Sequence, residues 1–200
     1  MLFEKQRVYL NSLKSREYLY LLYAGGVSCG KSLLQIGIIH QMAMDYPGTV
    51  YAIVRKNLST LKRTSIPTFT KVVELNGDEI ACRLNRAEHI VEYQNGSKIM
   101  FLEADMTKDP DLNKIKGIEL TMALIEEANE LEEQVFSILK TRVGRWRNKE
   151  LNIRPVIMLN CNPARGWLKD QFYDAYCDGI LPKNHYYLQA LPTDNPHNTQ

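Results

Sequence analysis

The feature that most constrains this chain is the segment from Tyr18 to Ser32, where an apolar run breaks into glycines and ends in Gly30, Lys31 and Ser32. Its glycines, lysine and serine match the spacing G-x-x-x-x-G-K-[ST] of a phosphate-binding loop. In such a loop the glycines let backbone N–H groups turn toward phosphate oxygens, the lysine brings a mobile positive charge, and the serine hydroxyl can bind Mg²⁺. We therefore predict that ATP and Mg²⁺ bind at Gly25, Gly26, Val27, Ser28, Cys29, Gly30, Lys31 and Ser32.

Composition favours one α/β domain without bulk charge. The chain has 200 residues, 44% of them hydrophobic, and a formal net charge of +2, so any nucleic-acid contact must come from local patches. Its cysteines form no C-x-x-C pair, which favours free thiols in a reducing compartment. No stretch reads as a signal peptide or a membrane span, and we expect a cytoplasmic protein.

The hydrophobic pattern predicts alternating strands and helices around this loop. Continuous apolar runs at 18–23 and 49–54 predict buried parallel strands, and the periodicity at 31–44 predicts a helix between them. Residues 58–75 predict a second helix, interrupted near Pro67. Short alternating runs from 80 to 102 flank Asn95-Gly96, which indicates an antiparallel hairpin. The expected fold class is α/β, a P-loop NTPase of RecA/ASCE-like type with a mainly parallel sheet flanked by helices and an inserted antiparallel hairpin.

An acidic pair follows the apolar run 121–125 directly. At the carboxyl end of a parallel strand, Glu126 could hold Mg²⁺ directly or through water, and Glu127 could orient and deprotonate a water aimed at the γ-phosphate. The alternative is a solvated acidic turn, because Glu130, Glu132 and Glu133 follow. Given the phosphate loop, the catalytic interpretation is favoured.

Two groups of basic residues stand near expected element ends. Arg55 and Lys56 follow the strand at 49–54 and could contact phosphate or DNA, or lie in a solvated loop. A helix expected from Leu131, Val135, Ile138 and Leu139 is closed by Gly144 and carries cations at its end. Arg142 and Arg145, three apart and so on one face, could reach a neighbouring subunit's γ-phosphate or grip DNA; the alternative is that they only complement the helix dipole.

Three amides complete the candidate site. Asn160 and Asn162 end the apolar strand expected at 154–159, where they could sense the γ-phosphate or simply form a turn. Gln6 lies upstream of the first strand and could read the adenine edge, because an amide both donates and accepts; an exposed glutamine on an N-terminal helix is the alternative. A short helix at 167–176 and a last strand at 186–191 follow.

In order and spacing, these motifs resemble the N-terminal ATPase domain of a large terminase subunit, the motor that packages double-stranded DNA into tailed-phage heads. The resemblance rests on the segments GGVSCGKS, IVRK, YQNGSKIMFL, ALIEEANEL, TRVGRWR, NCNP and PTDNP. It implies Lys31 and Ser32 on phosphate and Mg²⁺, Glu126 at the metal, Glu127 as the catalytic carboxylate, and Asn160 to Pro163 in coupling. Many members carry an arginine in the phosphate loop where this chain has Val27, which favours a trans arginine at Arg142 or Arg145.

The resemblance also implies partners and boundaries. We expect a homo-oligomeric ring around double-stranded DNA, with the portal protein and small terminase subunit as partners, in the host cytoplasm and docked on the procapsid portal. Residues 1–191 are expected to form the ATPase domain, with 192–200 a linker toward a ribonuclease-H-like nuclease missing from this fragment. The rival hypotheses are another RecA-like DNA helicase or translocase, a nucleotide kinase, which would lack the hairpin insert, and a non-catalytic assembly module.

Overall fold

The fold is built on a single sheet, seen in a computed structural model that describes residues 2–196. Within these residues the sheet has eight strands in the order β3-β4-β5-β2-β6-β7-β1-β8. Six neighbouring strands pair in parallel, in the order β5-β2-β6-β7-β1-β8. Strand β4 pairs antiparallel with β5, and β3 pairs antiparallel with β4 at the edge of the sheet. Their bounds are β1 Tyr20–Gly25, β2 Val50–Arg55, β3 Cys82–Asn85, β4 Ile90–Tyr93, β5 Lys98–Glu103, β6 Met122–Ile125, β7 Ile157–Cys161 and β8 His185–Ala190.

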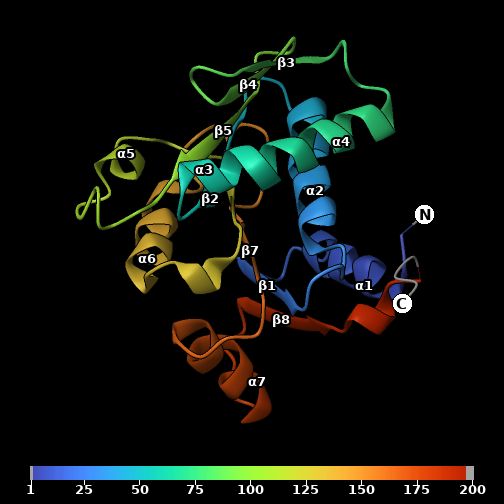
Figure 1. The fold of residues 1–200 in the computed structure, drawn as a ribbon, viewed down its shortest axis with the longest axis vertical. Coiled ribbons are helices and arrows are strands. Elements are labelled where there is room, and N and C mark those ends of the chain that lie inside the picture. Colours follow the sequence, from blue (N-terminus) through green and yellow to red (C-terminus); the bar gives the residue numbers. More distant parts are fainter. Residues whose placement is uncertain (1, 197–200) are drawn as a thin grey trace.

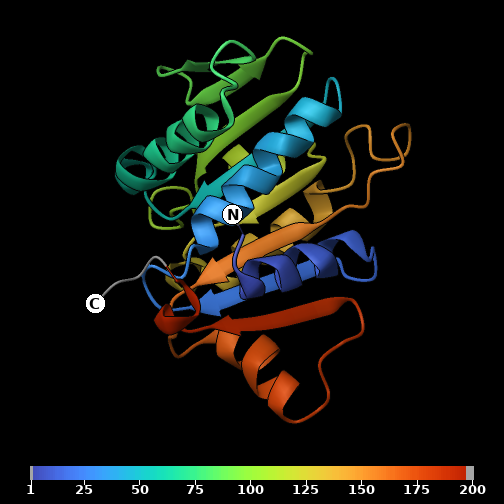
Figure 2. The ribbon, with the colours of Figure 1, turned by 90° about the vertical axis from the view of Figure 1, so that its right-hand side faces the viewer.

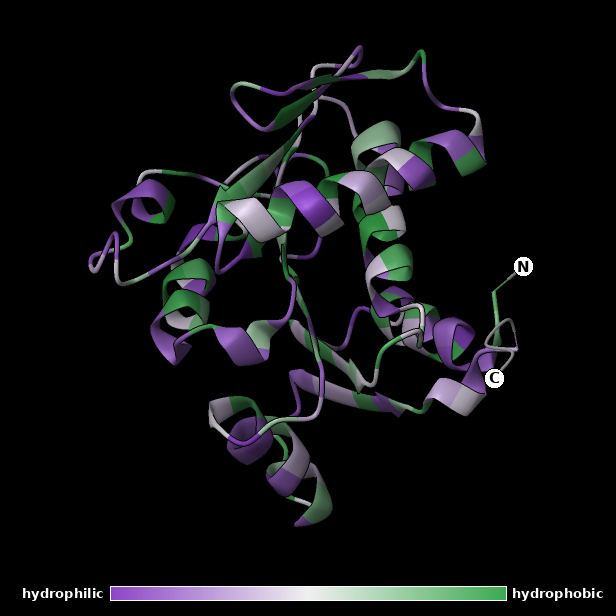
Figure 3. Cartoon of the chain, viewed as in Figure 1, coloured by the Kyte–Doolittle hydropathy of each residue, from purple (hydrophilic) through white to green (hydrophobic). Residues whose placement is uncertain are grey.

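Helices cover both faces of this sheet (Figures 1 and 2). One face packs against α1 (Glu4–Lys14), α2 (Lys31–Asp45) and α4 (Ile66–Asn76), and the other against α5 (Asn113–Lys116), α6 (Glu133–Arg142) and the segment leading into α7 (Ala175–Cys177). Strand β6 is buried along its whole length, as its continuous apolar sequence predicts, and β7 is buried throughout although it includes Asn160, which was expected to follow the strand. In Figure 3, helices α2, α4 and α6 each carry both hydrophobic and hydrophilic residues, which is typical of helices with one face on a sheet.

The architecture confirms the predicted α/β fold class, including its inserted hairpin. Strands β4 and β5 meet at a turn in which Gly96 has a φ of 82°, a left-handed conformation that suits glycine. The side chain of Asn95 donates hydrogen bonds to the carbonyl oxygens of Ala43 and Met44, at 2.8 and 3.0 Å. The same turn therefore satisfies carbonyls at the end of α2 and ties the hairpin to the helix.

The helical region 58–76 is interrupted just ahead of Pro67, as expected. Helix α3 (Leu58–Thr60) passes into a π-helical segment, Leu61–Ser65, and regular helix resumes in α4 at Ile66. Pro67 lies in the first turn of α4, directly after the π-helical segment, where its missing N–H is tolerated. All four cysteines are free, as predicted. Within residues 2–196, no helix combines the length and apolarity needed to cross a bilayer.

Candidate functional site

The site lies where three parallel strands end. Strand β1 runs into the phosphate loop at Gly25, β6 runs into Glu126, and β7 runs into Asn162. Because β6 pairs with β7 and β7 with β1, all in parallel, the three strand ends share one edge of the sheet. Ligands of open α/β sheets collect at this carboxyl edge.

The phosphate loop is shaped by left-handed residues and folded around its own lysine. Ser28 and Gly30 both have a φ of 68°, which turns the chain back before α2 begins at Lys31. The Lys31 ammonium is buried and donates hydrogen bonds to the carbonyl oxygens of Gly25 and Gly26, at 2.6 and 2.7 Å. It also lies 3.5 Å from Asn162 Oδ1. Phosphate oxygens that approach this loop therefore compete with backbone carbonyls for the same ammonium.

A cavity of about 320 Å³ opens over the loop. Its walls include the phosphate loop, Glu127 from the end of β6 and Asn162 from the end of β7. Thr68 and Lys71 of α4 also line the cavity, although neither was predicted as a site residue. The sequence carries no motif at these two positions; their place depends on the packing of α4 against α2, which only the tertiary structure shows. The cavity brings together the predicted residues Val27, Ser28, Cys29, Gly30, Lys31, Ser32, Glu127 and Asn162.

Glu127 is held in an uncommon backbone conformation. Its φ and ψ are 46° and 52°, the left-handed region that residues with a Cβ seldom adopt. Its backbone N–H donates a hydrogen bond to Asn160 Oδ1 at 2.9 Å. Burial raises the pKa of the Glu127 carboxyl, while the charges of Lys31 and Arg55 act in the opposite direction. A carboxylate with a raised pKa next to a phosphate loop is suited to accept a proton from water.

The side chain of Glu126, the expected magnesium ligand, contacts Ser65 rather than lining the cavity. It is buried, and its Oε2 accepts a hydrogen bond from the Ser65 hydroxyl, at the end of the π-helical segment. Glu126 is not among the residues that line the cavity. The available donors still fit a nucleotide-borne Mg²⁺, because Ser32 offers a hydroxyl inside the cavity and Glu126 offers a hard carboxylate oxygen at the neighbouring strand end.

The predicted amides contact the phosphate loop or the Glu127 backbone. Asn160 is fully buried and contacts the Glu127 backbone, and Asn162 reaches the Lys31 ammonium. Gln6 of α1 is 5% exposed and donates a hydrogen bond to the Gly30 carbonyl oxygen at 3.3 Å. The alternative of an exposed glutamine is therefore wrong, because α1 packs against the phosphate loop rather than standing in solvent.

The basic pair at the end of α6 lies far from the cavity. Helix α6 starts near the carboxyl edge and returns to the amino edge, where Leu120 pairs with Val143 just ahead of β6. The Arg142 guanidinium donates to the Lys116 carbonyl oxygen at 2.8 Å, and Arg145 is exposed. The helix ends at Arg142, so the expectation that Arg142 and Arg145 share one helix face is wrong. The bridge to Leu120 draws the chain into an extended path instead.

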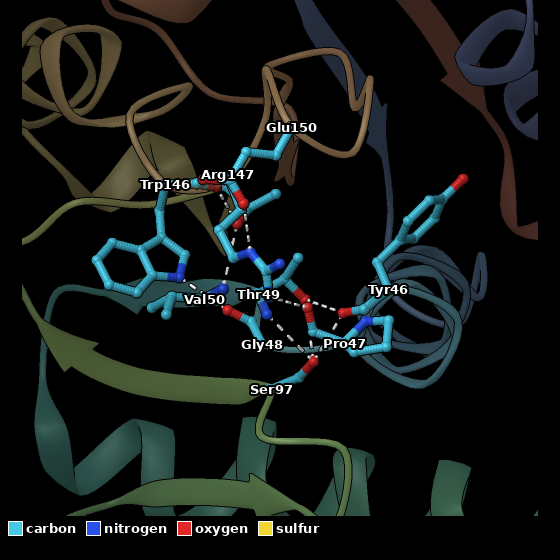
Figure 4. Close-up of polar contacts among 10 residues, drawn as sticks. Tyr46, Pro47, Gly48, Thr49, Val50, Ser97, Trp146, Arg147 and Glu150 are labelled. Atoms are coloured by element: carbon cyan, nitrogen blue, oxygen red, sulfur yellow. Dashed lines mark hydrogen bonds and ion pairs between the residues drawn. The ribbon is translucent and has the colours of Figure 1, made fainter.

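The residues after Arg145 fasten the amino edge (Figure 4). The Trp146 indole donates to the Gly48 carbonyl oxygen and the Arg147 guanidinium donates to the Pro47 carbonyl oxygen, both at 2.8 Å. Arg147 also pairs with Glu150 at 3.0 Å. These contacts hold the turn before β2 and give Trp146 and Arg147 a structural role at the edge opposite the cavity.

Arg55, the last residue of β2, and Lys56, which follows it, have different surroundings. The Arg55 side chain is 12% exposed, donates to the Thr64 hydroxyl at 2.7 Å, and is close enough to lower the pKa of Glu127. The Lys56 ammonium lies 3.6 Å from a carboxylate oxygen of Glu132, as a partly exposed pair. Of the two alternatives left open by the sequence, a solvated loop is therefore wrong for Arg55.

Comparison with solved structures shows the same fold in viral packaging proteins. The large terminase of a thermophilic bacteriophage superposes with a TM-score of 0.76 at 19% identity, over 98% of this chain and 48% of that one. The bacteriophage HK97 large terminase gives 0.71 at 11% identity, over 94% and 39%. The N-terminal domain of the bacteriophage phi29 DNA-packaging ATPase gives 0.60 at 16%, over 94% and 96%. This chain thus spans about half the length of the thermophilic phage protein.

A sequence comparison assigns the family independently of the fold. No curated protein matches this chain. The family model for the phage terminase large subunit matches residues 17–197, which include the phosphate loop, the acidic pair and both strand-end asparagines. The chain therefore belongs to the phage terminase large subunit family.

Proposed function

We propose that this chain is an ATP-hydrolysing motor domain that drives the packaging of viral double-stranded DNA into a procapsid. The observation that carries the proposal is the cavity in which Lys31, Ser32 and Glu127 meet. The thermophilic phage terminase, a structural neighbour, has been solved with ADP and with ATP-γ-S. Residues 1–191 act as the ATPase domain and 192–200 as a linker; positions 1 and 197–200 lie outside the described residues.

The proposed chemistry follows from the contacts around the loop. When ATP enters, Lys31 leaves the carbonyl oxygens of Gly25 and Gly26 for the β- and γ-phosphates. Ser32, with support from Glu126, would hold a nucleotide-borne Mg²⁺, which would supply positive charge against the phosphates. Glu127 orients water toward the γ-phosphorus and accepts its proton, while the bond between the γ-phosphorus and the bridging oxygen breaks and ADP leaves.

An arginine from the same subunit cannot complete this site from the end of α6. Strand β6 has four residues, Met122–Ile125, so at about 3.3 Å per residue the two sheet edges are on the order of 13 Å apart or more. Arg142 and Arg145 lie at one edge and Glu127 at the other. If either arginine acts, it acts on a neighbouring subunit in a ring around the DNA, with the portal and small terminase subunit as further partners in the host cytoplasm.

The first test measures steady-state ATP hydrolysis as protein concentration rises. Wild type should show activity that climbs faster than linearly, and Glu127→Ala should abolish it. Glu119→Ala, which removes an exposed carboxylate near the amino edge, is the matched control and should behave as wild type. Equal rates for wild type and Glu127→Ala would refute the role of Glu127, and stimulation by single strands rather than duplex DNA would favour a helicase.

A mixing experiment tests the trans arginine. Glu127→Ala subunits keep their arginines, and Arg145→Ala subunits keep an intact cavity. If Arg145 acts in trans, mixing the two inactive variants should restore activity, to about a quarter of the wild-type level in a ring of random order. The same mixture with Arg142→Ala identifies which arginine acts. Two variants that stay inactive when mixed, for both arginines, would refute the trans assignment.

A further inference from the structure

A chain of buried amides connects the phosphate-loop helix to Glu127. The side chains of Tyr9 in α1, Gln35 in α2 and Asn160 in β7 are all fully buried. The Gln35 amide nitrogen donates to the Tyr9 hydroxyl at 2.7 Å and to the Leu159 carbonyl oxygen at 3.0 Å. The Asn160 amide nitrogen donates to Gln35 Oε1 at 2.8 Å, and Asn160 Oδ1 accepts from the Glu127 backbone N–H at 2.9 Å.

The hydrogen bonds along this row of amides can run in only one direction, because the row begins at a backbone carbonyl group and ends at a backbone N–H group. The Leu159 carbonyl can only accept a hydrogen bond, so the donating nitrogen of Gln35 must face it. Gln35 Oε1 then faces Asn160, which must present its own nitrogen. Asn160 Oδ1 is thereby directed at the Glu127 N–H, which can only donate. Gln35 Oε1 and the Glu127 N–H therefore hold the Asn160 amide in the same orientation, one at each end.

The orientation of the Asn160 amide matters because the left-handed backbone conformation of Glu127 needs a stabilising contact. A left-handed residue with a side chain persists where surrounding contacts hold it, and the Asn160 oxygen provides such a contact. A reversed Asn160 amide would place an NH₂ group against the Glu127 N–H, two donors face to face. The carboxylate would then lose its fixed place in the cavity.

We propose that Gln35 is a positioning residue for the Glu127 carboxylate, acting through the Asn160 amide. Gln35 lies four residues after Lys31, one turn along the same helix, so a shift of α2 on phosphate binding also reaches Asn160. Helices α1 and α2 lie on the same face of the sheet, where α1 contacts β8 and α2 contacts β1 and β7 (Figure 2). The inference rests on the proposed function, in which Glu127 is the catalytic carboxylate.

The test replaces Gln35 by methionine, which keeps the unbranched shape and removes the amide. Gln41→Leu is the matched control, because Gln41 is an exposed glutamine of the same helix that bonds Asp45. Gln35→Met should lower kcat by about 10- to 100-fold, as expected for a misplaced reacting group, and leave ATP affinity within about threefold. Gln41→Leu should match wild type. Gln35→Leu gives a second apolar replacement if the methionine variant folds poorly.

Two further readouts separate positioning from a general packing role. The Glu127 amide, followed by hydrogen exchange in NMR spectra, should lose protection in Gln35→Met and keep it in Gln41→Leu. Asn160→Leu should lower kcat at least as far, and adding Gln35→Met to it should cause little additional loss, because both act along one route.

The outcomes are distinguishable. Unchanged kcat and protection in Gln35→Met, or equal losses of kcat and ATP affinity, would overturn the positioning role. If wild type hydrolyses no ATP, the proposed function fails, and protection of the Glu127 amide still decides whether Gln35 fixes the Asn160 amide.

Discussion

Gly25 is the position where the phosphate loop and the edge of the sheet constrain each other most tightly. It is the last residue of β1 and pairs with Ala190 of β8. A Cβ added at Gly25 would lie 2.4 Å from the Ala190 carbonyl oxygen, a contact with backbone that no rotamer change relieves. Ordinary contact begins at 3.4 Å, so Gly25→Ala must shift one of the two strands by about 1 Å.

The expected loss follows from this overlap. Overpacking of this kind costs about 1–3 kcal/mol. For a domain of this size, that lowers the melting temperature by roughly 2–12 °C. Gly25 is also the residue at which β1 runs into the phosphate loop, so the same shift should displace the loop and weaken ATP binding.

Gly37 provides the matched control within the adjoining helix. It lies in α2, and a Cβ there would have its closest neighbour, Val72 Cγ1, at 4.0 Å. Gly37→Ala should therefore raise stability by about 0.5–1 kcal/mol, the helix preference of alanine over glycine. Both variants restrict the unfolded chain equally, so their difference isolates the clash at Gly25.

The assay is thermal unfolding of both variants by circular dichroism, with titration of a fluorescent ATP analogue. We expect melting temperatures displaced in opposite directions from wild type, and weakened nucleotide binding only in Gly25→Ala. If Gly25→Ala melts within one degree of wild type and binds the nucleotide as tightly, then β8 yields freely at Ala190 and the reasoning is refuted.

Further predictions concern the amino edge and the Glu127 carboxyl. Gly48→Ala should lose more stability than Gly77→Ala in urea unfolding. The left-handed backbone costs alanine roughly 1–2 kcal/mol at both positions, but only at Gly48 would the added Cβ lie 2.4 Å from Arg147 Nη1. Equal losses would contradict the proposed close contact between Arg147 and the turn before β2. Since burial raises the pKa of Glu127, kcat should fall with decreasing pH at values above the ordinary glutamate range, and Arg55→Ala should move that limb to still higher pH. The raised pKa also means that the folded state loses stability as pH rises from the ordinary glutamate pKa through the raised pKa of Glu127. Glu127→Gln should therefore melt at a higher temperature than wild type at pH 8 and at the same temperature at pH 3. A difference of opposite sign would refute the pKa direction.

The sequence was sufficient for the sheet and the loop because their signals are local. Continuous apolar runs predicted the central strands, Asn95-Gly96 predicted the hairpin, and the glycine pattern predicted the loop before Lys31. Each of these depends on residues within one turn or one strand, where backbone preference and burial act together.

The missing part of the site depends on contacts between distant segments. Glu126 was expected to hold Mg²⁺ directly or through water, and only the packing of the π-helical segment brings Ser65 to it. In the sequence, Gln35 is an ordinary polar residue of a helix; only the packing of α2 against β7 and α1 shows its contacts with Leu159 and Tyr9. Arg142 and Arg145 were assigned to one face because the helix signal does not reveal where Leu120 draws the chain away.

The phosphate loop is also clamped by segments from both ends of the chain. Gln6 of α1 contacts the Gly30 carbonyl on one side, and the Asn195 amide donates to the Ser28 carbonyl oxygen at 2.6 Å on the other. Each contact occupies a carbonyl of a loop whose N–H groups must turn toward phosphate, so each favours the orientation that binding needs. A motif of eight residues therefore acquires its shape from elements that are more than 150 residues apart in sequence, Gln6 and Asn195. Under the proposed function, movement of either segment would therefore change the shape of the nucleotide site.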